Sequence, residues 1–271
     1  MSAQFVAVVI PVYKDIPSHN EIISLRQCLS VLGHYPIEFV GPASLNTASY
    51  CEFCSPKTPF NYNSFDDAYF KDVNGYNRLL LSKNFYKRFS NYRYILIHQL
   101  DAFVFKDELS YWCHQGYHYI GAPQVAHLNG PGEIQFLKGY SKVLNIINAL
   151  FKTNYTVKNV GNGGFSLRHV TKCLGLMSLM HSKLKAWGNL NEDGFFKYAG
   201  NLLSPYFKLP TEDIALKFAV EINPQAAIAS LNGSLPFGCH AFDKYEPEFW
   251  EKYIPGLKTE FANANQSARS N

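Results

Sequence analysis

One stretch near the middle of the chain constrains the fold more than any other. Tyr94 to Ile97 form an apolar run that leads into Gln99-Leu100-Asp101, and Ala102 to Phe105 are apolar again. A short apolar run of this kind is typical of a strand buried on both faces, as in a parallel sheet covered by helices. Ligands of such sheets bind beyond the carboxyl ends of the strands, so the pattern predicts a carboxylate placed for a metal or a phosphate-bearing substrate. The alternative is that Asp101 caps a turn or lies in an ordinary loop.

Strand and helix patterns alternate along the chain. Residues 5–12 form a β-branched strand, residues 19–32 have helical spacing, and residues 37–40 form a second short strand, which together predict a βαβ unit. Further helices are expected over residues 74–89, 141–151, 170–185 and 193–199, with a long irregular loop over residues 121–139. We expect one α/β domain over residues 1–257, with a Rossmann-like, mostly parallel central sheet flanked by helices, and a flexible polar tail over residues 258–271.

The composition fits a globular protein and disfavours several functional classes. Of the 271 residues, 47% are hydrophobic and 15% aromatic, which suits a large core and is compatible with stacking on a sugar or a nucleotide. The net charge of +4 is modest and the Lys and Arg residues form no blocks, so we expect no nucleic-acid binding. No stretch approaches 18 apolar residues and the amino terminus lacks a signal-peptide pattern, so we expect a cytoplasmic protein.

Six cysteines are spread along the chain without the density of a disulfide framework, so we expect reduced thiols. Cys51 and Cys54 form a C-x-x-C pair, but no second pair follows at zinc-finger spacing. Zinc or redox use of this pair is therefore disfavoured.

A second chemical segment is the glycine-rich loop Gly161-Asn162-Gly163-Gly164, which is followed by a strand-like Phe165-Ser166-Leu167. Three glycines within four residues let the backbone approach a ligand closely. The spacing matches neither the dinucleotide-binding fingerprint nor the P-loop. We therefore favour a binding loop of another kind over a plain turn.

Three more segments have both a functional and a structural interpretation. Pro11, Tyr13 and Lys14 end the first strand, where a ring and a cation could meet a nucleotide, although this could also be a simple strand exit. Asn191-Glu192-Asp193 could supply a general base at a helix start, or only favourable helix capping. His240 could be a metal ligand, or an ordinary core histidine.

Taken in order, these segments resemble nucleotide-sugar-dependent glycosyltransferases of the GT-A fold, over about residues 5–245. The chain is most similar to a bacterial family long classed as a domain of unknown function, which shares the motifs Q-L-D-A-F-V-F, G-N-G-G-F-S-L-R, N-E-D and P-F-G-x-H-A. The resemblance implies transfer of a hexose from a nucleotide-diphosphate sugar, typically a UDP-sugar, to a hydroxyl of a glycan or glycolipid. It also implies Mn²⁺ or Mg²⁺ as cofactor, a setting in polysaccharide biosynthesis, and peripheral contact with the inner face of a membrane where the acceptor is lipid-linked.

The resemblance also assigns roles to residues. Asp101 and His240 would bind the metal, Asp193 would be the catalytic base, and Glu192 beside it would contact the acceptor. The loop residues that would support the acceptor and the donor sugar are Asn162, Gly163 and Gly164, and the residues that would bind the donor nucleotide are Pro11, Tyr13, Lys14, Asn77, Lys83, Gln99 and Asp101.

One position departs from the wider class, whose central tripeptide is Asp-x-Asp. Gln99 stands where the first acid would be, and an amide can bind a ribose but brings no charge. This departure leaves open a catalytically weak binding module of the same fold. Phosphoryl chemistry at Asp101, Asp193 and His240 is a further alternative, which the lack of a second adjoining carboxylate disfavours. An in-line displacement that inverts the anomeric centre is the mechanism we expect. A retaining outcome is the alternative, since stereochemistry depends on geometry that spacing does not reveal.

Overall fold

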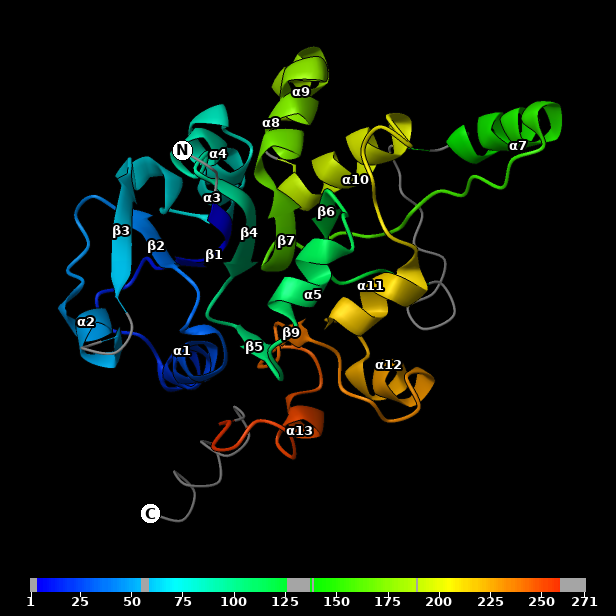
Figure 1. The fold of residues 1–271 in the computed structure, drawn as a ribbon. Helices are drawn as coiled ribbons and strands as arrows, with labels where there is room; N and C mark the ends of the chain where they lie inside the picture. Colours follow the sequence, from blue (N-terminus) through cyan, green and yellow to red (C-terminus); the bar gives the residue numbers. More distant parts are fainter. Residues whose placement is uncertain (1–3, 55–58, 126–136, 138, 189, 259–271) are drawn as a thin grey trace.

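The computed structural model describes residues 4–54, 59–125, 137, 139–188 and 190–258. Its centre is a six-stranded sheet with the strand order β3-β2-β1-β4-β7-β6 (Figure 1). The strands are β1 (Gln4–Pro11), β2 (Ile37–Pro42), β3 (Phe60–Phe65), β4 (Tyr92–His98), β6 (Tyr119–Ile120) and β7 (Phe165–His169).

Strand direction decides which loops meet at the edge of this sheet. β3, β2, β1 and β4 are parallel, whereas β7 runs antiparallel to β4, and β6 runs antiparallel to β7. The carboxyl ends of the four parallel strands therefore share one edge, and the loop before β7 reaches the same edge because Phe165 pairs with His98. The expectation of a mostly parallel α/β sheet is confirmed.

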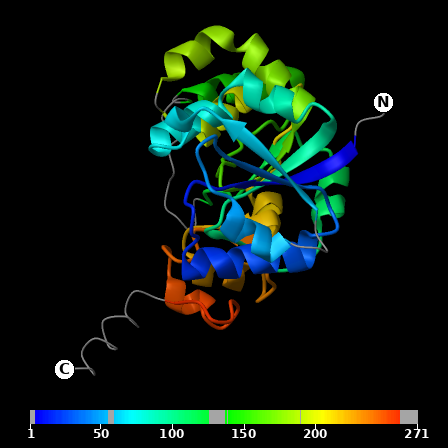
Figure 2. The same ribbon diagram turned by 90° about the vertical axis from the view of Figure 1, so that its left-hand side faces the viewer.

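Helices cover both faces of the sheet (Figure 2). Alternate residues of β1 point to opposite faces, so Val8 belongs to one apolar core and Val9 to the other. The first core includes residues of α1 (His19–Leu32), α2 (Ala48–Cys54), α5 (Leu109–His114) and α11 (Glu212–Phe218). The second includes residues of α3 (Val73–Leu80), α4 (Lys83–Arg88), α8 (Val170–Leu179), α9 (His181–Trp187) and α10 (Glu192–Leu202).

A second, three-stranded sheet has the order β5-β9-β8. It consists of β5 (Ala102–Val104), β8 (Ala219–Val220) and β9 (Gly238–His240), and it shares a third apolar core with α12 (Pro224–Ser230) and α13 (Pro247–Trp250). β9 runs antiparallel to β5, so His240 lies opposite Ala102. Strands of two or three residues leave no periodic pattern, which is why the sequence did not reveal this sheet.

Two expected helices are each interrupted. The helix expected over residues 74–89 is α3 followed by α4, because Ser82 accepts a hydrogen bond from the Phe85 amide at 3.1 Å and caps a new helix. The helix expected over residues 170–185 is α8 followed by α9, with Met180 between them. Most of the loop expected over residues 121–139, and the tail beyond residue 258, lie outside the described residues, so the proposed domain limit stays a prediction.

The remaining elements and the cysteines agree with the sequence analysis where they are described. A short 3-10 helix, η1 (Asp67–Tyr69), follows β3, and α7 (Tyr140–Phe151) matches the helix expected over residues 141–151 with one more residue at its start. All six cysteines are free. Among the described residues, no helix combines the length and the apolar character needed to cross a membrane.

Because His98 is buried, we expect it to make the folded state less stable as the pH falls. Burial lowers the pKa of His98 to about 4, so the unfolded chain takes up this proton more readily than the folded chain as the pH falls below about 6.5. His98→Phe removes the titration and keeps a ring against Phe165. The unfolding free energy lost between pH 7 and pH 5 should then be smaller by about 1–2 kcal/mol, measured by urea unfolding. His181→Phe, which makes the same exchange at an exposed histidine, is the control, and an equal effect of both changes would contradict the assignment.

Candidate active site

A cluster of polar side chains lies where the carboxyl end of β4 meets the small sheet. His240 Nε2 is 3.2 Å from Asp101 Oδ1 and 3.1 Å from Gln99 Oε1. On the other side of the ring, His240 Nδ1 is 3.2 Å from Glu221 Oε1. The structure thus brings together Gln99, Asp101 and His240, which the sequence indicated, and adds Glu221, which follows β8 and carried no signal in the sequence.

The charges in this cluster stabilise one another. Burial lowers the pKa of His240, but the carboxylates of Asp101 and Glu221 outweigh burial and raise it to about 10. Burial raises the pKa of Asp101, but His240 outweighs burial and holds it below its usual value. At neutral pH the ring is therefore a cation between two carboxylates, with the Nδ1 hydrogen available to Glu221.

The backbone of the glycine loop packs against the side chains of His240 and Gln99. The backbone N–H of Gln99 donates to the Gly164 carbonyl at 2.8 Å, which joins the loop to the end of β4. A Cβ at Gly164 would overlap His240 Nε2 and would lie 2.5 Å from Gln99 Oε1. Asn162 lies between the loop and the histidine, because its Oδ1 accepts from the Gly164 backbone amide at 2.9 Å and its Nδ2 is 2.9 Å from His240 Nδ1. The glycine at position 164 is required by close approach to the site.

The other two glycines of the loop face α10. A Cβ at Gly163 would overlap the Glu192 carboxylate, and a Cβ at Gly161 would lie 2.8 Å from Lys197 Cε and 3.2 Å from Asp193 Oδ2. The loop therefore lies between the β4 turn with His240 on one side and the start of α10 on the other. This contact brings the third segment selected from the sequence to the same site.

Glu192 lies inside the protein and not at the surface. Its Oε1 accepts from Arg168 Nη2 at 2.8 Å, and both side chains are almost fully buried. Arg168 also donates to the Gly163 carbonyl at 3.1 Å and to the Tyr86 hydroxyl at 3.1 Å. Burial raises the pKa of Glu192 to about 7, although Arg168 opposes the shift. In this placement the Glu192 carboxylate holds Arg168 and the loop, and its expected contact with an acceptor stays a prediction.

Asp193 occupies a different position one residue later. The helix N-cap is Asn191, so Asp193 stands within the first turn, is partly exposed, and accepts no hydrogen bond from the described residues. Lys197 lies one helical turn further. Burial lowers its pKa, and the nearby carboxylates of Asp193 and Glu221 oppose this shift only in part. The i, i+4 spacing of Asp193 and Lys197 is the signal that could have identified Lys197 from the sequence.

The exit of β1 lies near the same acids. Pro11 ends β1 and is buried, while Tyr13 is 56% exposed and its pKa is raised, first by burial and also by nearby Asp101 and Asp243. Lys14 forms an exposed ion pair with Glu21 at 2.9 Å. Tyr13 therefore lies within electrostatic range of Asp101, whereas Lys14 has a carboxylate partner already.

The residues selected from α3 and α4 differ in their placement. Asn77 is buried in α3, and its Nδ2 has no hydrogen-bond partner among the described residues. Its neighbour Tyr76 faces the site, since burial raises its pKa while a hydrogen bond to Gln99 opposes the shift. Lys83 begins α4 and makes no hydrogen bond or ion pair with the described residues, so the structure does not join it to the cluster.

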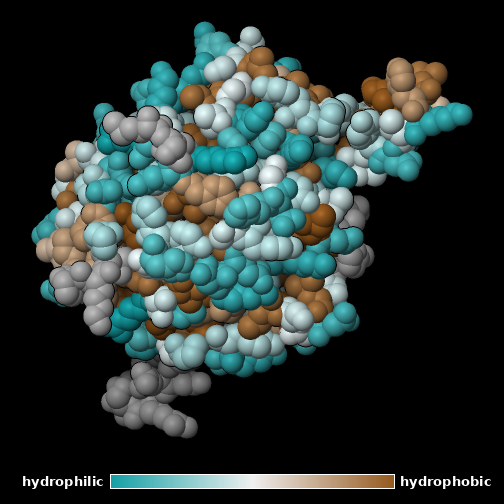
Figure 3. Space-filling view, in the orientation of Figure 1, coloured by the Kyte–Doolittle hydropathy of each residue, from teal (hydrophilic) through white to brown (hydrophobic). Residues whose placement is uncertain are grey.

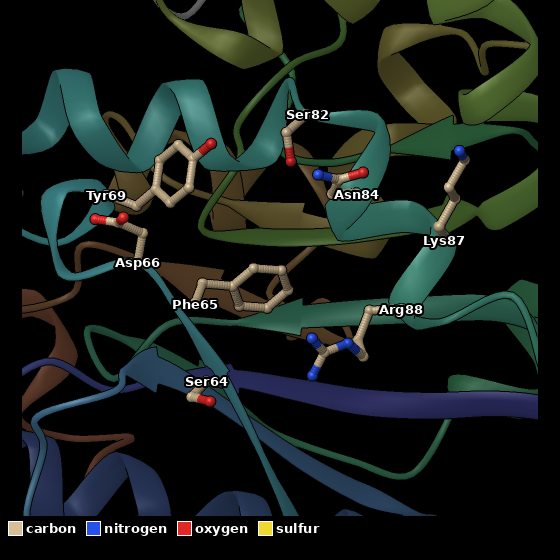
Figure 4. Close-up of a pocket in the computed structure, with 8 residues that line it drawn as sticks. All are labelled: Ser64, Phe65, Asp66, Tyr69, Ser82, Asn84, Lys87 and Arg88. Carbon is tan, nitrogen blue, oxygen red and sulfur yellow. The ribbon is translucent and has the colours of Figure 1, made fainter.

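A separate cavity of about 700 Å³ lies between the end of β3, η1 and α4 (Figure 4). Its lining residues are Ser64, Phe65, Asp66, Tyr69, Ser82, Asn84, Lys87 and Arg88. The guanidinium of Arg88 lies over the ring of Phe65, 5.1 Å from its centroid. This cavity shares no residue with the cluster around Asp101 and His240.

The residues present fit a divalent cation with few protein ligands. Among the described residues, no group of three His, Cys, Asp or Glu side chains forms a metal-ligand set. Asp101 Oδ1 is nevertheless buried without a conventional hydrogen bond, and it faces His240 Nε2. Glu221 on the opposite nitrogen supplies the carboxylate partner that metal-binding histidines typically have. Asp101 and His240 could hold Mn²⁺ or Mg²⁺ once a ligand supplies further oxygen atoms.

Comparison with protein families identifies the chain. The family described as "Protein of unknown function (DUF5672)" matches residues 59–240. The chain belongs to this family. The matched region contains the Gln99–Asp101 turn, the glycine loop, the start of α10 and His240. A comparison with curated proteins finds no match.

Solved structures with the same fold are glycosyltransferases. The galactosyltransferase LgtC in complex with donor and acceptor sugar analogs has a TM-score of 0.57 at 10% identity, covering 95% of this chain and 99% of that chain. Mouse xyloside xylosyltransferase 1 has a TM-score of 0.50 at 12% identity, covering 87% of this chain and 96% of that chain. The glycosyltransferase GlyE of Streptococcus pneumoniae has a TM-score of 0.51 at 12% identity, covering 98% of this chain and 64% of that chain. The GT-A fold expected from the sequence is confirmed.

The close approach at Gly164 gives a testable consequence for stability. Gly164→Ala places a methyl group against His240 and Gln99, so the unfolding free energy should fall by about 1–3 kcal/mol, as for other overpacked sites. Gly175 in α8 is the matched control, because a Cβ there meets nothing within 4 Å. Gly175→Ala should be neutral or stabilising, since alanine favours a helix. Urea unfolding measures the stability of both variants. Equal stability of Gly164→Ala and the wild type would show that His240 and Gln99 leave room for a Cβ at this position.

Proposed function

We propose that this protein is a glycosyltransferase that moves a hexose from a nucleotide-diphosphate sugar, with UDP as the nucleotide, to a hydroxyl of a glycan or glycolipid. The observation that carries this proposal is the arrangement of Asp101, His240 and Glu221 at the carboxyl edge of a GT-A sheet. The family and the structural relatives support the fold on which this chemistry depends.

Asp101 and His240 would hold Mn²⁺ or Mg²⁺ together with oxygen atoms of the donor diphosphate. A bound cation would supply charge neutralisation for the departing diphosphate. Glu221 would keep the Nδ1 hydrogen of His240, and the Nε2 proton would be released when the cation binds. Because Gln99 brings no charge, the protein alone offers only one carboxylate and one imidazole, and cation binding should depend on the donor.

The donor nucleotide would extend over the exit of β1. The exposed ring of Tyr13 offers a stacking surface, and the amide of Gln99 can hydrogen-bond a ribose hydroxyl. Lys14 is available to a phosphate because its pair with Glu21 is exposed, and such pairs are weak. Lys83 has no part in this arrangement.

Asp193 is the base in this proposal. The acceptor oxygen attacks the anomeric carbon, the bond from that carbon to the diphosphate oxygen breaks, and the electron pair leaves with the nucleoside diphosphate. The acceptor proton passes to the Asp193 carboxylate, which is partly exposed and free of hydrogen bonds from the described residues. A single displacement of this kind inverts the anomeric centre. Glu192 has a positioning role, through Arg168 and the glycine loop.

Donor binding gives the first test. UDP with MnCl₂ should raise the melting temperature of the wild type more than UDP alone, because a ligand bound only by the folded state stabilises it. Asp101→Asn should abolish the manganese-dependent part. Because it also removes a charge paired with His240, its apo melting temperature should fall, and each ligand shift is measured against the apo value of the same variant. The control Asp107→Asn changes an exposed carboxylate that faces His34 and should behave as the wild type. An unchanged manganese effect in Asp101→Asn would refute this metal site.

The base is tested by turnover. In Asp193→Asn, release of UDP from UDP-glucose or UDP-galactose, measured with water as acceptor, should fall about a hundredfold or more, while UDP affinity persists. Asp213 is a matched control, because it follows Glu212 in the first turn of α11 just as Asp193 follows Glu192 in α10. Asp213→Asn should retain full turnover. Near-normal turnover of Asp193→Asn would remove the base from this helix.

A further inference from the structure

Helix α7 projects from the body of the molecule and exposes apolar side chains (Figures 1 and 3). Val143 is 49% exposed, Ile146 61%, and Leu150 and Phe151 72% each. Leu144 is the one residue of the helix that is buried. Single exposed apolar residues are common on protein surfaces, but a contiguous apolar patch on one projecting helix indicates an interaction site for a protein or a membrane.

The helix is amphipathic. At 100° per residue, Val143, Ile146, Ile147 and Leu150 fall on one side of α7, and Phe151 extends that side. The opposite side carries Ser141, Lys142, Asn145 and Asn148, and Lys152 follows as the C-cap. An apolar face beside a lysine-containing polar face is the pattern of helices that lie in the interface of a bilayer.

The segment of the sequence that contains α7 is one-sided in charge. Residues 134–191 contain no Asp or Glu, whereas they contain seven Lys and one Arg. Since the whole chain has a formal charge of +4, the rest of the chain is at −4. Arg168 is buried and paired, but Lys142, Lys152, Lys183 and Lys185 are exposed. In both views α7 and the lysine-bearing α9 lie on the side of the molecule away from α13 (Figures 1 and 2).

We propose that α7 docks this protein onto an anionic lipid surface, with its apolar face in the headgroup region and the surrounding lysines on the lipid phosphates. Charge complementarity selects this occupant, because each lysine near an anionic surface adds attraction. A second copy of the chain would place lysine against lysine. A 12-residue helix is also only about 18 Å long, too short to bury the roughly 800 Å² per partner of a stable dimer. The docking is independent of the proposed transfer reaction.

Vesicle binding tests this surface without any enzymatic assay. In co-sedimentation, the wild type should bind vesicles of phosphatidylcholine with 30% phosphatidylglycerol at least tenfold better than pure phosphatidylcholine vesicles, and 0.5 M NaCl should weaken the binding. Ile146→Ser, Leu150→Ser and Phe151→Ser combined should reduce binding tenfold or more. The control, Ile16→Ser with Val73→Ser, removes apolar groups that are 77% and 73% exposed elsewhere and should bind as the wild type.

Two further variants separate the contributions and keep the proposal open to refutation. Lys142→Gln with Lys152→Gln should weaken binding to the anionic vesicles and leave the melting temperature unchanged, because both side chains are exposed. Ile146→Trp should show a blue-shifted fluorescence component only with anionic vesicles. Absence of wild-type binding, or equal binding by the α7 serine variant, would overturn the proposal. A dimer in light scattering that the serine variant abolishes, without vesicle binding, would assign the face to a second copy instead.

Discussion

The close approach of the glycine loop to side chains from three other segments is the constraint on which the site depends. Gly164 lies against His240 and Gln99, Gly163 against Glu192, and Gly161 against Asp193 and Lys197. The contacts of Gly163 and Gly164 are possible only without a Cβ, whereas at Gly161 the flexible end of Lys197 could move aside. Two of the three glycines therefore follow from packing. Because β7 is antiparallel to β4, the loop reaches the carboxyl edge of the sheet from the opposite direction to the parallel strands. The loop thereby joins a turn, a helix start and the end of a strand that are distant in sequence.

The buried pair of Arg168 and Glu192 fixes that loop through the hydrogen bond from Arg168 to the Gly163 carbonyl. Arg168 donates hydrogen bonds to Glu192, Ser166, Tyr86 and the Gly163 carbonyl. Its guanidinium carbon lies 5.2 Å from the centroid of the Tyr119 ring. Burying such a pair gains little net stability, but removing one partner leaves a buried charge and costs about 3–5 kcal/mol. The value of the pair therefore lies in fixing one position of the loop relative to α10. That position places Glu192 inside and leaves the next residue, Asp193, facing outward.

Much of the fold was predictable, because it depends on long periodic segments. The strand at residues 5–12 and the helix at residues 19–32 have clear patterns, and the structure has β1 and α1 there within a residue. Breaks such as Ser82 were missed, because a single cap can end an otherwise continuous helical pattern. The small sheet was missed because its strands have two or three residues. Without that sheet, the register that sets His240 opposite Ala102 could not be foreseen.

The same limit explains which site residues the sequence revealed. Asp101 and the glycines were recognisable because each follows or precedes a strong strand, whereas Glu221 follows a two-residue strand, and its contact with His240 exists only in three dimensions. Local pattern could not assign Glu192 and Asp193 to different sides, since adjacent residues of a first helical turn differ by about 100° in direction and only the core decides which one points inward. Arg168 decides it here, because its guanidinium is buried beside α10 and donates to the Glu192 carboxylate. The different roles of the two acids therefore depend on Arg168 of β7. They could not be predicted from the Asn-Glu-Asp segment alone.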